Sequence, residues 1–202
     1  MSGDRYLTLA GEGHGQLREK ASRFIAVAFP VRDEGSFHAR MEAYVKEHRG
    51  ARHFCYAWVM GDAGERHRAH DAGEPSGTAG KPILTRIQAA GLTWCGVIVV
   101  RWFGGTLLGK GGLVRAYGEA AHLAIDAAPK AEHIVTDTLL LRCGYDQLEP
   151  LRAAVIAHGG EVVSGDYGER CELLVRVPRS ATSTLLSEHA MRAVTVVPQE
   201  EK

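Results

Sequence analysis

Glycines and cationic residues are concentrated in one stretch of this chain, where together they could bind an anion. Eleven of the 24 glycines lie within residues 73–118, well above an even share. Two segments carry most of them, DAGEPSGTAGKPIL (residues 71–84) and VIVVRWFGGTLLGKGGLVRAYGEA (residues 97–120). Glycine leaves the backbone open to a close ligand, and nearby cations attract negative charge. The sequence therefore predicts an anion-binding site in this stretch.

The predicted site has two parts. The anion- or nucleic-acid-binding residues are Lys81, Arg101, Gly104, Gly105, Gly109, Lys110, Gly111, Gly112 and Arg115. The motif loop beside them consists of Asp71, Gly73, Glu74, Pro75, Ser76, Gly77, Thr78 and Gly80. Amides at the start of a helix near residues 111–113, together with the helix dipole, are suited to a phosphate or carboxylate.

A purely structural interpretation of these glycines is the main alternative. They would then only permit a tight turn from strand to helix and close packing against the motif loop. Arg101, Lys110 and Arg115 have no obvious acidic partners nearby in the sequence, and turn geometry alone does not require cations. We therefore favour anion binding over the structural interpretation.

Nucleotide hydrolysis is not expected at this site. Gly104, Gly109 and Lys110 reproduce the G-x-x-x-x-G-K spacing of a P-loop, in a segment that reads strand, loop, helix. The next residue of that motif is Ser or Thr, whose hydroxyl holds magnesium, and here it is Gly111.

A catalytic interpretation of the motif loop remains open beside the binding one. Asp71 and Glu74 could form a carboxylate pair near Thr78 and Lys81, whose spacing imitates the S-x-x-K motif of serine enzymes. The same residue types are also common in turns and helix caps, which is the interpretation we favour. We assign no catalytic residue and expect no cofactor.

Metal binding is also not expected. His53 and Cys55 are two residues apart on a predicted strand and share a face, whereas His67 and His70 are three apart and face opposite ways. Isolated polar residues on a strand are more often packed than metal-bound, so no metal ligand is assigned.

The overall composition is that of an ordinary soluble protein. The chain has 202 residues, 45% of them apolar and 24% charged, with a formal net charge of zero. Bulk charge therefore cannot hold nucleic acid, although a local group of cations can. No apolar run reaches the roughly 18 residues of a membrane span, and the first residues do not resemble a signal peptide. Four isolated cysteines without a C-x-x-C pair indicate buried thiols, so we expect a cytoplasmic protein with no membrane partner.

The pattern of elements predicts a mixed α/β and α+β protein with two domains, residues 1–133 and 134–202. In the first, strands are expected at residues 22–31, 55–60, 66–71 and 96–103, and helices from Ser36, from Thr78 and over residues 113–127. In the second, strand 136–143, helix 147–158, strands 161–166 and 171–177, helix 180–189 and strand 193–197 form a βαββαβ order. That order is typical of a ferredoxin-like domain.

Several blocks of this sequence resemble the IMPACT/YigZ family. The two glycine-rich segments are close to the signature of that family, and ASRFIAVAFPV (residues 21–31) and ARHFCYAWVMG (residues 51–61) are similar to its other recognisable blocks. Cys143-Gly144-Tyr145 resembles the start of the C-terminal domain of the bacterial members. The resemblance covers nearly the whole chain.

The resemblance implies a fold and a cellular context. It implies an N-terminal βαβ domain like the fourth domain of elongation factor G, and a ferredoxin-like C-terminal domain like the fifth domain of that factor. Eukaryotic members with the same N-terminal domain regulate translation during amino-acid starvation. We therefore expect a non-enzymatic, translation-associated protein whose partner is RNA, the ribosome or a translation factor. The alternative is an enzyme acting on a small phosphorylated or carboxylated metabolite at the same cleft.

Overall fold

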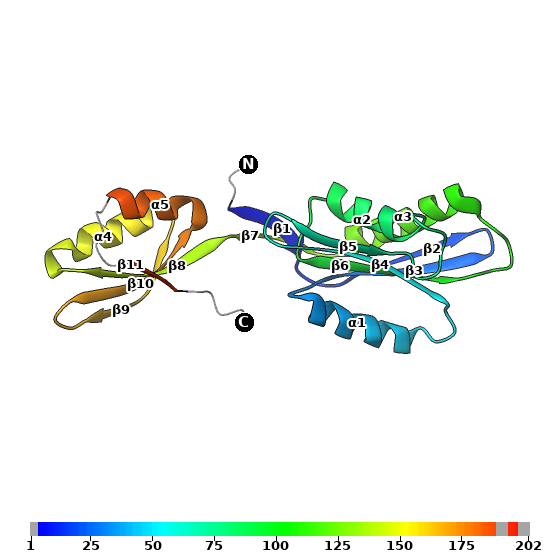
Figure 1. Cartoon of the computed structure of the whole chain (residues 1–202), viewed down its shortest axis with the longest axis horizontal. Coiled ribbons are helices and arrows are strands. Elements are labelled where there is room, and N and C mark those ends of the chain that lie inside the picture. The colour runs from blue at the N-terminus through cyan, green and yellow to red at the C-terminus, as the bar shows by residue number, and fades with distance from the viewer. Residues whose placement is uncertain (1–3, 189–193, 198–202) are drawn as a thin grey trace. The chain divides into compact units, whose positions relative to one another are not determined.

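The chain folds as two compact units. The computed structural model describes residues 4–188 and 194–197 (Figure 1). The first unit is Tyr6–His133, and the second begins at Ile134 and includes Asp4 and Arg5. Asp4 belongs with the second unit because its carboxylate accepts a hydrogen bond from the Ser180 amide at 2.8 Å, and its carbonyl accepts one from Val135 at 2.6 Å. The first unit therefore begins a few residues later than the sequence predicted.

The first unit is built on a five-stranded sheet. Its strands are β2 (Gly13–Glu19), β3 (Ser22–Pro30), β4 (His53–Met60), β5 (Arg66–His70) and β6 (Cys95–Trp102). They lie in the order β2-β3-β6-β4-β5, and each neighbouring pair is antiparallel. The first unit is thus of the α+β class. The α/β class, which the sequence analysis also predicted, does not describe this antiparallel sheet.

Three helices cover this sheet, one on one face and two on the other. Helix α1 (Glu34–Glu47) lies on one face, and α2 (Gly80–Ala89) and α3 (Gly109–Ala127) lie on the opposite face (Figure 1). Strand β6 is buried on both faces, because Val97 and Val99 pack in the α2–α3 core while Ile98 and Val100 pack in the α1 core. Burial on both faces explains why this strand is a continuous apolar run.

Asp33 rather than Ser36 caps α1, which begins at Glu34. The Asp33 carboxylate accepts a hydrogen bond from the Ser36 amide at 2.6 Å, and the Ser36 hydroxyl accepts one from the Asp33 amide at 3.1 Å. This reciprocal pair is a capping box, in which Ser36 occupies the third helical position. The prediction that Ser36 caps the helix is therefore wrong by three residues.

Strands β1 (Arg5–Leu9), β2 and β7 (Lys130–Ile134) were not expected from the sequence. Strand β1 pairs with β7 in a separate two-stranded sheet. Strand β2 lies against α3 through Gly13 and Gly15, where an added Cβ would overlap backbone atoms of Ala124 and Ala120. Since the inward positions of β2 are glycines, the strand lacks the apolar alternation that would have identified it.

The second unit has the predicted order of elements. These are β8 (Thr136–Cys143), α4 (Tyr145–Ala157), β9 (Glu161–Tyr167), β10 (Cys171–Pro178), α5 (Arg179–Glu188) and β11 (Val194–Val197). The strands lie in the order β11-β8-β10-β9, with antiparallel pairing, and α4 and α5 lie on one face (Figure 1). Residues 189 and 193, which were expected to end α5 and begin β11, fall outside the described residues. Within the described parts of both units, no helix is long and apolar enough to cross a membrane.

Candidate anion and nucleic-acid site

Glu74 joins the two glycine-rich segments in space. Its Oε1 accepts hydrogen bonds from Arg101 Nη1 at 2.8 Å and from the Tyr117 hydroxyl at 2.7 Å. The side chains of Arg101 and Glu74 are only 6% and 4% exposed, so this ion pair is buried. Burial raises the pKa of the Tyr117 hydroxyl well above its ordinary value, which keeps it a donor. The loop before α2 is thereby fixed to the end of β6 and to α3.

Arg101 therefore has an acidic partner, Glu74, which is distant in the sequence rather than near it. A second hydrogen bond runs from Arg101 Nη2 to the Ser22 hydroxyl at 3.2 Å. Because Glu74 neutralises this guanidinium, Arg101 contributes little free positive charge to a surface anion site.

Asp71 occupies the start of α2. Its carboxylate accepts hydrogen bonds from the amides of Gly77 at 2.8 Å, Ala79 at 3.0 Å and Gly80 at 2.8 Å. Thr78, which was expected to cap this helix, instead donates its hydroxyl to the Pro75 carbonyl at 2.6 Å. The start of α2 is thus already satisfied by a carboxylate and is closed to an external anion.

We expect Asp71→Asn to destabilise the first unit by about 1–2 kcal/mol at neutral pH, since charge-assisted capping is lost. Burial alone would raise the pKa of Asp71, but its three amide hydrogen bonds outweigh burial and hold the pKa below the ordinary value. The ionised Asp71 therefore contributes fully to the free energy of unfolding above the unfolded pKa of about 3.9. This contribution is lost as pH falls through the folded pKa. Urea unfolding, monitored by tryptophan fluorescence, should show a difference in the free energy of unfolding between wild type and variant. This difference should shrink below about pH 4. A difference that stays constant into acid would contradict this assignment.

Three potential nucleophiles around the motif loop, Cys55, Thr78 and Glu74, are engaged in the fold. The thiol of Cys55 donates to the Asp71 carbonyl at 3.0 Å, and burial raises its pKa to about 12, so it is not a thiolate. Thr78 is buried with its hydroxyl bound to a carbonyl, and Glu74 is bound to Arg101. These contacts agree with the structural interpretation of the loop rather than the catalytic one.

The start of α3 is open, in contrast to that of α2. The helix begins at Gly109, two to four residues before the start predicted near residues 111–113, and within the described residues no side chain caps it. Gly105 and Gly109 have positive φ of 87° and 69°, and a Cβ on Gly104 would overlap the Ala21 carbonyl. Gly111 has neither constraint, because the nearest atom to an added Cβ is Arg115 Nη1 at 3.6 Å. Gly111 is therefore the one member of this group whose small size is not explained by the turn or its packing.

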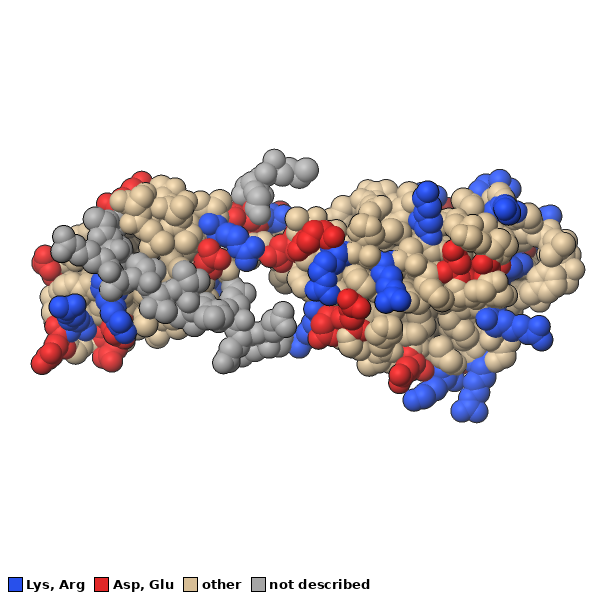
Figure 2. All heavy atoms as spheres, in the orientation of Figure 1, with Lys and Arg blue, Asp and Glu red and all other residues tan. Residues whose placement is uncertain are grey.

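Lys81, Lys110 and Arg115 are exposed, as an anion site requires. Lys110 and Arg115 lie in the first two turns of α3, and Lys81 lies in the first turn of α2. Figure 2 shows cationic side chains at several separate places on the visible face of the first unit, interspersed with acidic ones. Attraction of a polyanion must then rely on a local group of cations rather than on a continuous basic surface.

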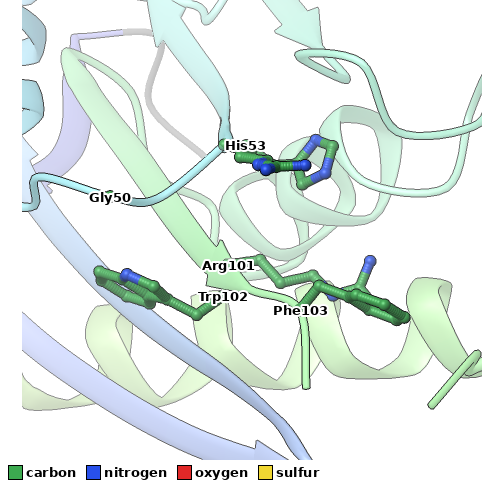
Figure 3. Close-up of a pocket in the computed structure, with 6 residues that line it drawn as sticks. Gly50, His53, Arg101, Trp102 and Phe103 are labelled. Carbon is green, nitrogen blue, oxygen red and sulfur yellow. The ribbon is translucent and has the colours of Figure 1, made fainter. Parts of the chain in front are cut away.

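A cavity of about 300 Å³ lies where β4 begins and β6 ends. It is lined by Gly50, Arg52, His53, Arg101, Trp102 and Phe103 (Figure 3). The sequence analysis identified only Arg101 as a binding residue here. Arg52 directly precedes His53, and Phe103 directly precedes the glycine-rich loop. Neither residue has a spacing pattern of its own, so the sequence analysis did not identify them as binding residues. The lining includes neither Lys81 nor Lys110.

Among the described residues, no group of three or more His, Cys, Asp or Glu side chains is placed to hold a metal ion. His53 and Cys55 do share a face of β4. Each is bound to a backbone carbonyl of the motif loop, His53 to that of Ala72 at 3.0 Å and Cys55 to that of Asp71 at 3.0 Å.

Comparison with known proteins identifies the family. Residues 20–125 match the Impact N-terminal domain, which covers more than half of the chain. The chain belongs to the IMPACT family. It is 36% identical over 161 residues to the IMPACT family member YigZ of Escherichia coli, covering 79% of each chain. It is 46% identical over 157 residues to an IMPACT family member of Thermus thermophilus, covering 78% of this chain and 84% of that one.

A solved structure is similar to this chain over both units. A crystal structure of a hypothetical protein superposes with a TM-score of 0.67 at 31% identity, covering 98% of this chain and 99% of the other. The Impact N-terminal match includes the motif loop, β6 and nearly all of α3. The candidate site thus lies wholly inside the region that defines the family.

Proposed function

We propose that this IMPACT family member is a non-enzymatic, translation-associated protein that contacts RNA or the ribosome through the start of α3. The contacting groups are the amides of Gly109–Gly112 and the cations Lys81, Lys110 and Arg115. The observation that carries the proposal is the contrast between the two helix starts. The start of α2 is closed by Asp71, whereas the start of α3 is glycine-built, uncapped and flanked by exposed cations. Open amides and nearby cations are the chemistry that binds phosphate.

The link to translation rests on the family and on the proposed domain likenesses. Regulation of translation by eukaryotic members with the same N-terminal domain favours a partner in the translation machinery. The strand order β11-β8-β10-β9 supports a ferredoxin-like assignment for the second unit. The split β3–α1–β4 arrangement around β6 supports the likeness of the first unit to the fourth domain of elongation factor G. Fold likeness alone does not establish function, so the test must address the site.

We expect Lys110→Ala combined with Arg115→Ala to weaken RNA binding and to flatten its salt dependence. Each lost phosphate contact should reduce the slope of log affinity against log salt by about 0.7 to 0.9. Stability should change by no more than about 0.5 kcal/mol, because both cations are on the surface. Fluorescence anisotropy with labelled RNA at several salt concentrations measures both affinity and slope.

A matched control removes two exposed cations from the other face of the sheet. Arg32→Ala combined with Lys46→Ala makes the same charge change at α1 and should leave the slope close to that of wild type. If the two double variants lost RNA affinity equally, then net charge, and not the start of α3, would drive binding. Unchanged binding in the α3 variant together with a large loss of stability would mean that these cations serve the fold.

A further inference from the structure

The cavity at the end of β6 combines groups that the fold does not use fully. Arg101 and Phe103 extend to the same side of the strand end, while Trp102 points to the other side (Figure 3). The Arg101 guanidinium lies 5.4 Å from the centre of the Phe103 ring. Glu74 and Ser22 engage the two terminal nitrogens of Arg101. The guanidinium is thereby fixed in place beside the cavity.

One donor on Arg101 has no partner. Arg101 is 5% exposed, and its Nε is buried without a hydrogen-bond partner among the described residues. An unpaired buried donor is unfavourable by about 1–3 kcal/mol, so such groups normally find an acceptor. Arg101 also lines the cavity, so its guanidinium is a polar group that a ligand with an acceptor oxygen or nitrogen would meet there.

The cavity also offers an aromatic face and a polar edge. Phe103 is 52% exposed, which is unusual for so large an apolar ring. Each ring has a guanidinium near it, that of Arg23 at 4.3 Å from the Trp102 centre and that of Arg101 at 5.4 Å from the Phe103 centre, but Phe103 is the more exposed ring. If His53 donates Nδ1–H to the Ala72 carbonyl, its Nε2 is left as an acceptor. Arg52 is exposed at the rim and adds a positive charge there.

We propose that this cavity binds a nucleotide, with the base stacked on Phe103, an acceptor of the base directed to Arg101 and the phosphate near Arg52. The inference rests on the proposed function and deepens it, since it places a base-binding subsite beside the phosphate-binding start of α3. Base–aromatic stacking next to cations is the general chemistry of single-strand binding. The cavity volume of about 300 Å³ lies at the lower end of the range for small-ligand sites.

The position of the cavity favours a nucleotide within an RNA strand. Phe103 is the first residue of the loop 103–108, which leads directly from β6 into the start of α3. A strand with its base on Phe103 can therefore continue toward the open amides and Lys110. A free nucleotide has the same base and phosphate but lacks this continuation, which makes the two sources distinguishable.

The test replaces the stacking ring without removing apolar bulk. Phe103→Leu keeps an apolar side chain and loses the aromatic face, whereas Phe103→Tyr keeps the face. With octauridine RNA as the probe, we expect Phe103→Leu to weaken binding about tenfold with an unchanged salt slope, and Phe103→Tyr to bind like wild type. Arg52→Gln should instead lower the salt slope by about 0.7. Because Phe103 and Arg52 are exposed, the variants should fold, and their unfolding curves verify this.

The outcomes separate this inference from the proposed function. A Phe103→Leu defect with octauridine and weak binding of uridine 5′-monophosphate would support an RNA nucleotide in the cavity. Tight, Phe103-dependent binding of the monophosphate alone would identify the free nucleotide as the ligand. Phe103→Leu equal to wild type with both probes would overturn the cavity site, even where the Lys110 and Arg115 variant still loses RNA binding. A wild-type protein that binds neither probe would overturn both proposals.

Discussion

Replacing Glu74 by Gln should destabilise the first unit by about 3–5 kcal/mol, since it leaves the charge of Arg101 buried without a counter-charge. The two side chains are 4% and 6% exposed, so water cannot take over the role of the carboxylate. The hydroxyl of Tyr117 loses its charged acceptor in the same step. Adding Arg101→Met should restore part of the loss, because removing both charges abolishes the unpaired one.

Tryptophan fluorescence during urea unfolding measures this effect cleanly. The three tryptophans of the chain, Trp58, Trp94 and Trp102, all lie in the first unit. The control is Glu34→Gln, which breaks the ion pair with Arg66 at 3.0 Å. The two side chains of that pair are 44–54% exposed, so losing the pair should lower the free energy of unfolding by about 1 kcal/mol at most. A Glu74 variant no less stable than the Glu34 variant would show that the buried charge has another source of compensation.

Gly104→Ala should destabilise the first unit by about 3 kcal/mol, at the upper end of the usual effect of overpacking. The added methyl would overlap the backbone carbonyl of Ala21, in the turn between β2 and β3, and a backbone atom cannot turn aside as a side chain can. The strand end and the loop 103–108 would then have to move apart. Urea unfolding by tryptophan fluorescence again gives the magnitude.

Gly111→Ala is the matched control, because it adds the same methyl in the same loop–helix segment without a clash. Stability should be unchanged or slightly higher, as is usual for Gly→Ala where φ is compatible. RNA binding should weaken, since the methyl adds bulk beside Arg115 at the helix start that is proposed to contact phosphate. Equal stability losses at both positions would mean that Gly111 is also required by packing.

Elements with a strong apolar pattern could be predicted from the sequence, and those built on glycine or polar residues could not. Strands β3 and β6 were predicted because most residues of β3 and nearly all of β6 are buried. Strand β2 was missed because Gly13 and Gly15 replace the apolar residues that normally face a helix. Strand β7 was not predicted because four of its five residues are exposed.

The sequence predicted that the two glycine-rich segments lie together, but it did not predict most of the contacts around them. The two glycine-rich segments do meet, through Glu74, Arg101 and Tyr117. The ion pair joins residues 27 positions apart, so no local spacing pattern reveals it. The sequence still offers Glu74 as the alternative partner of Arg101, because an arginine inside the apolar run of β6 requires a buried partner and Glu74 is one of only two acidic residues between Arg66 and Arg115. The cavity beside Phe103 depends on the pairing of β4 with β6, which the sequence did not specify.

The place of β6 in the sheet also decides when the first unit can fold during its synthesis. Strands β3 and β4 are made early, but each pairs with β6 and not with the other. Until residues 95–102 have left the ribosome, β3 can pair only with β2. Its apolar residues remain uncovered because β6 and the rest of the sheet are missing. Pairing of strands so distant in the chain is slow and exposes apolar surface while it is pending. The nascent chain therefore carries an open apolar strand for about a third of the synthesis of its 202 residues, and that interval is when it most needs a chaperone.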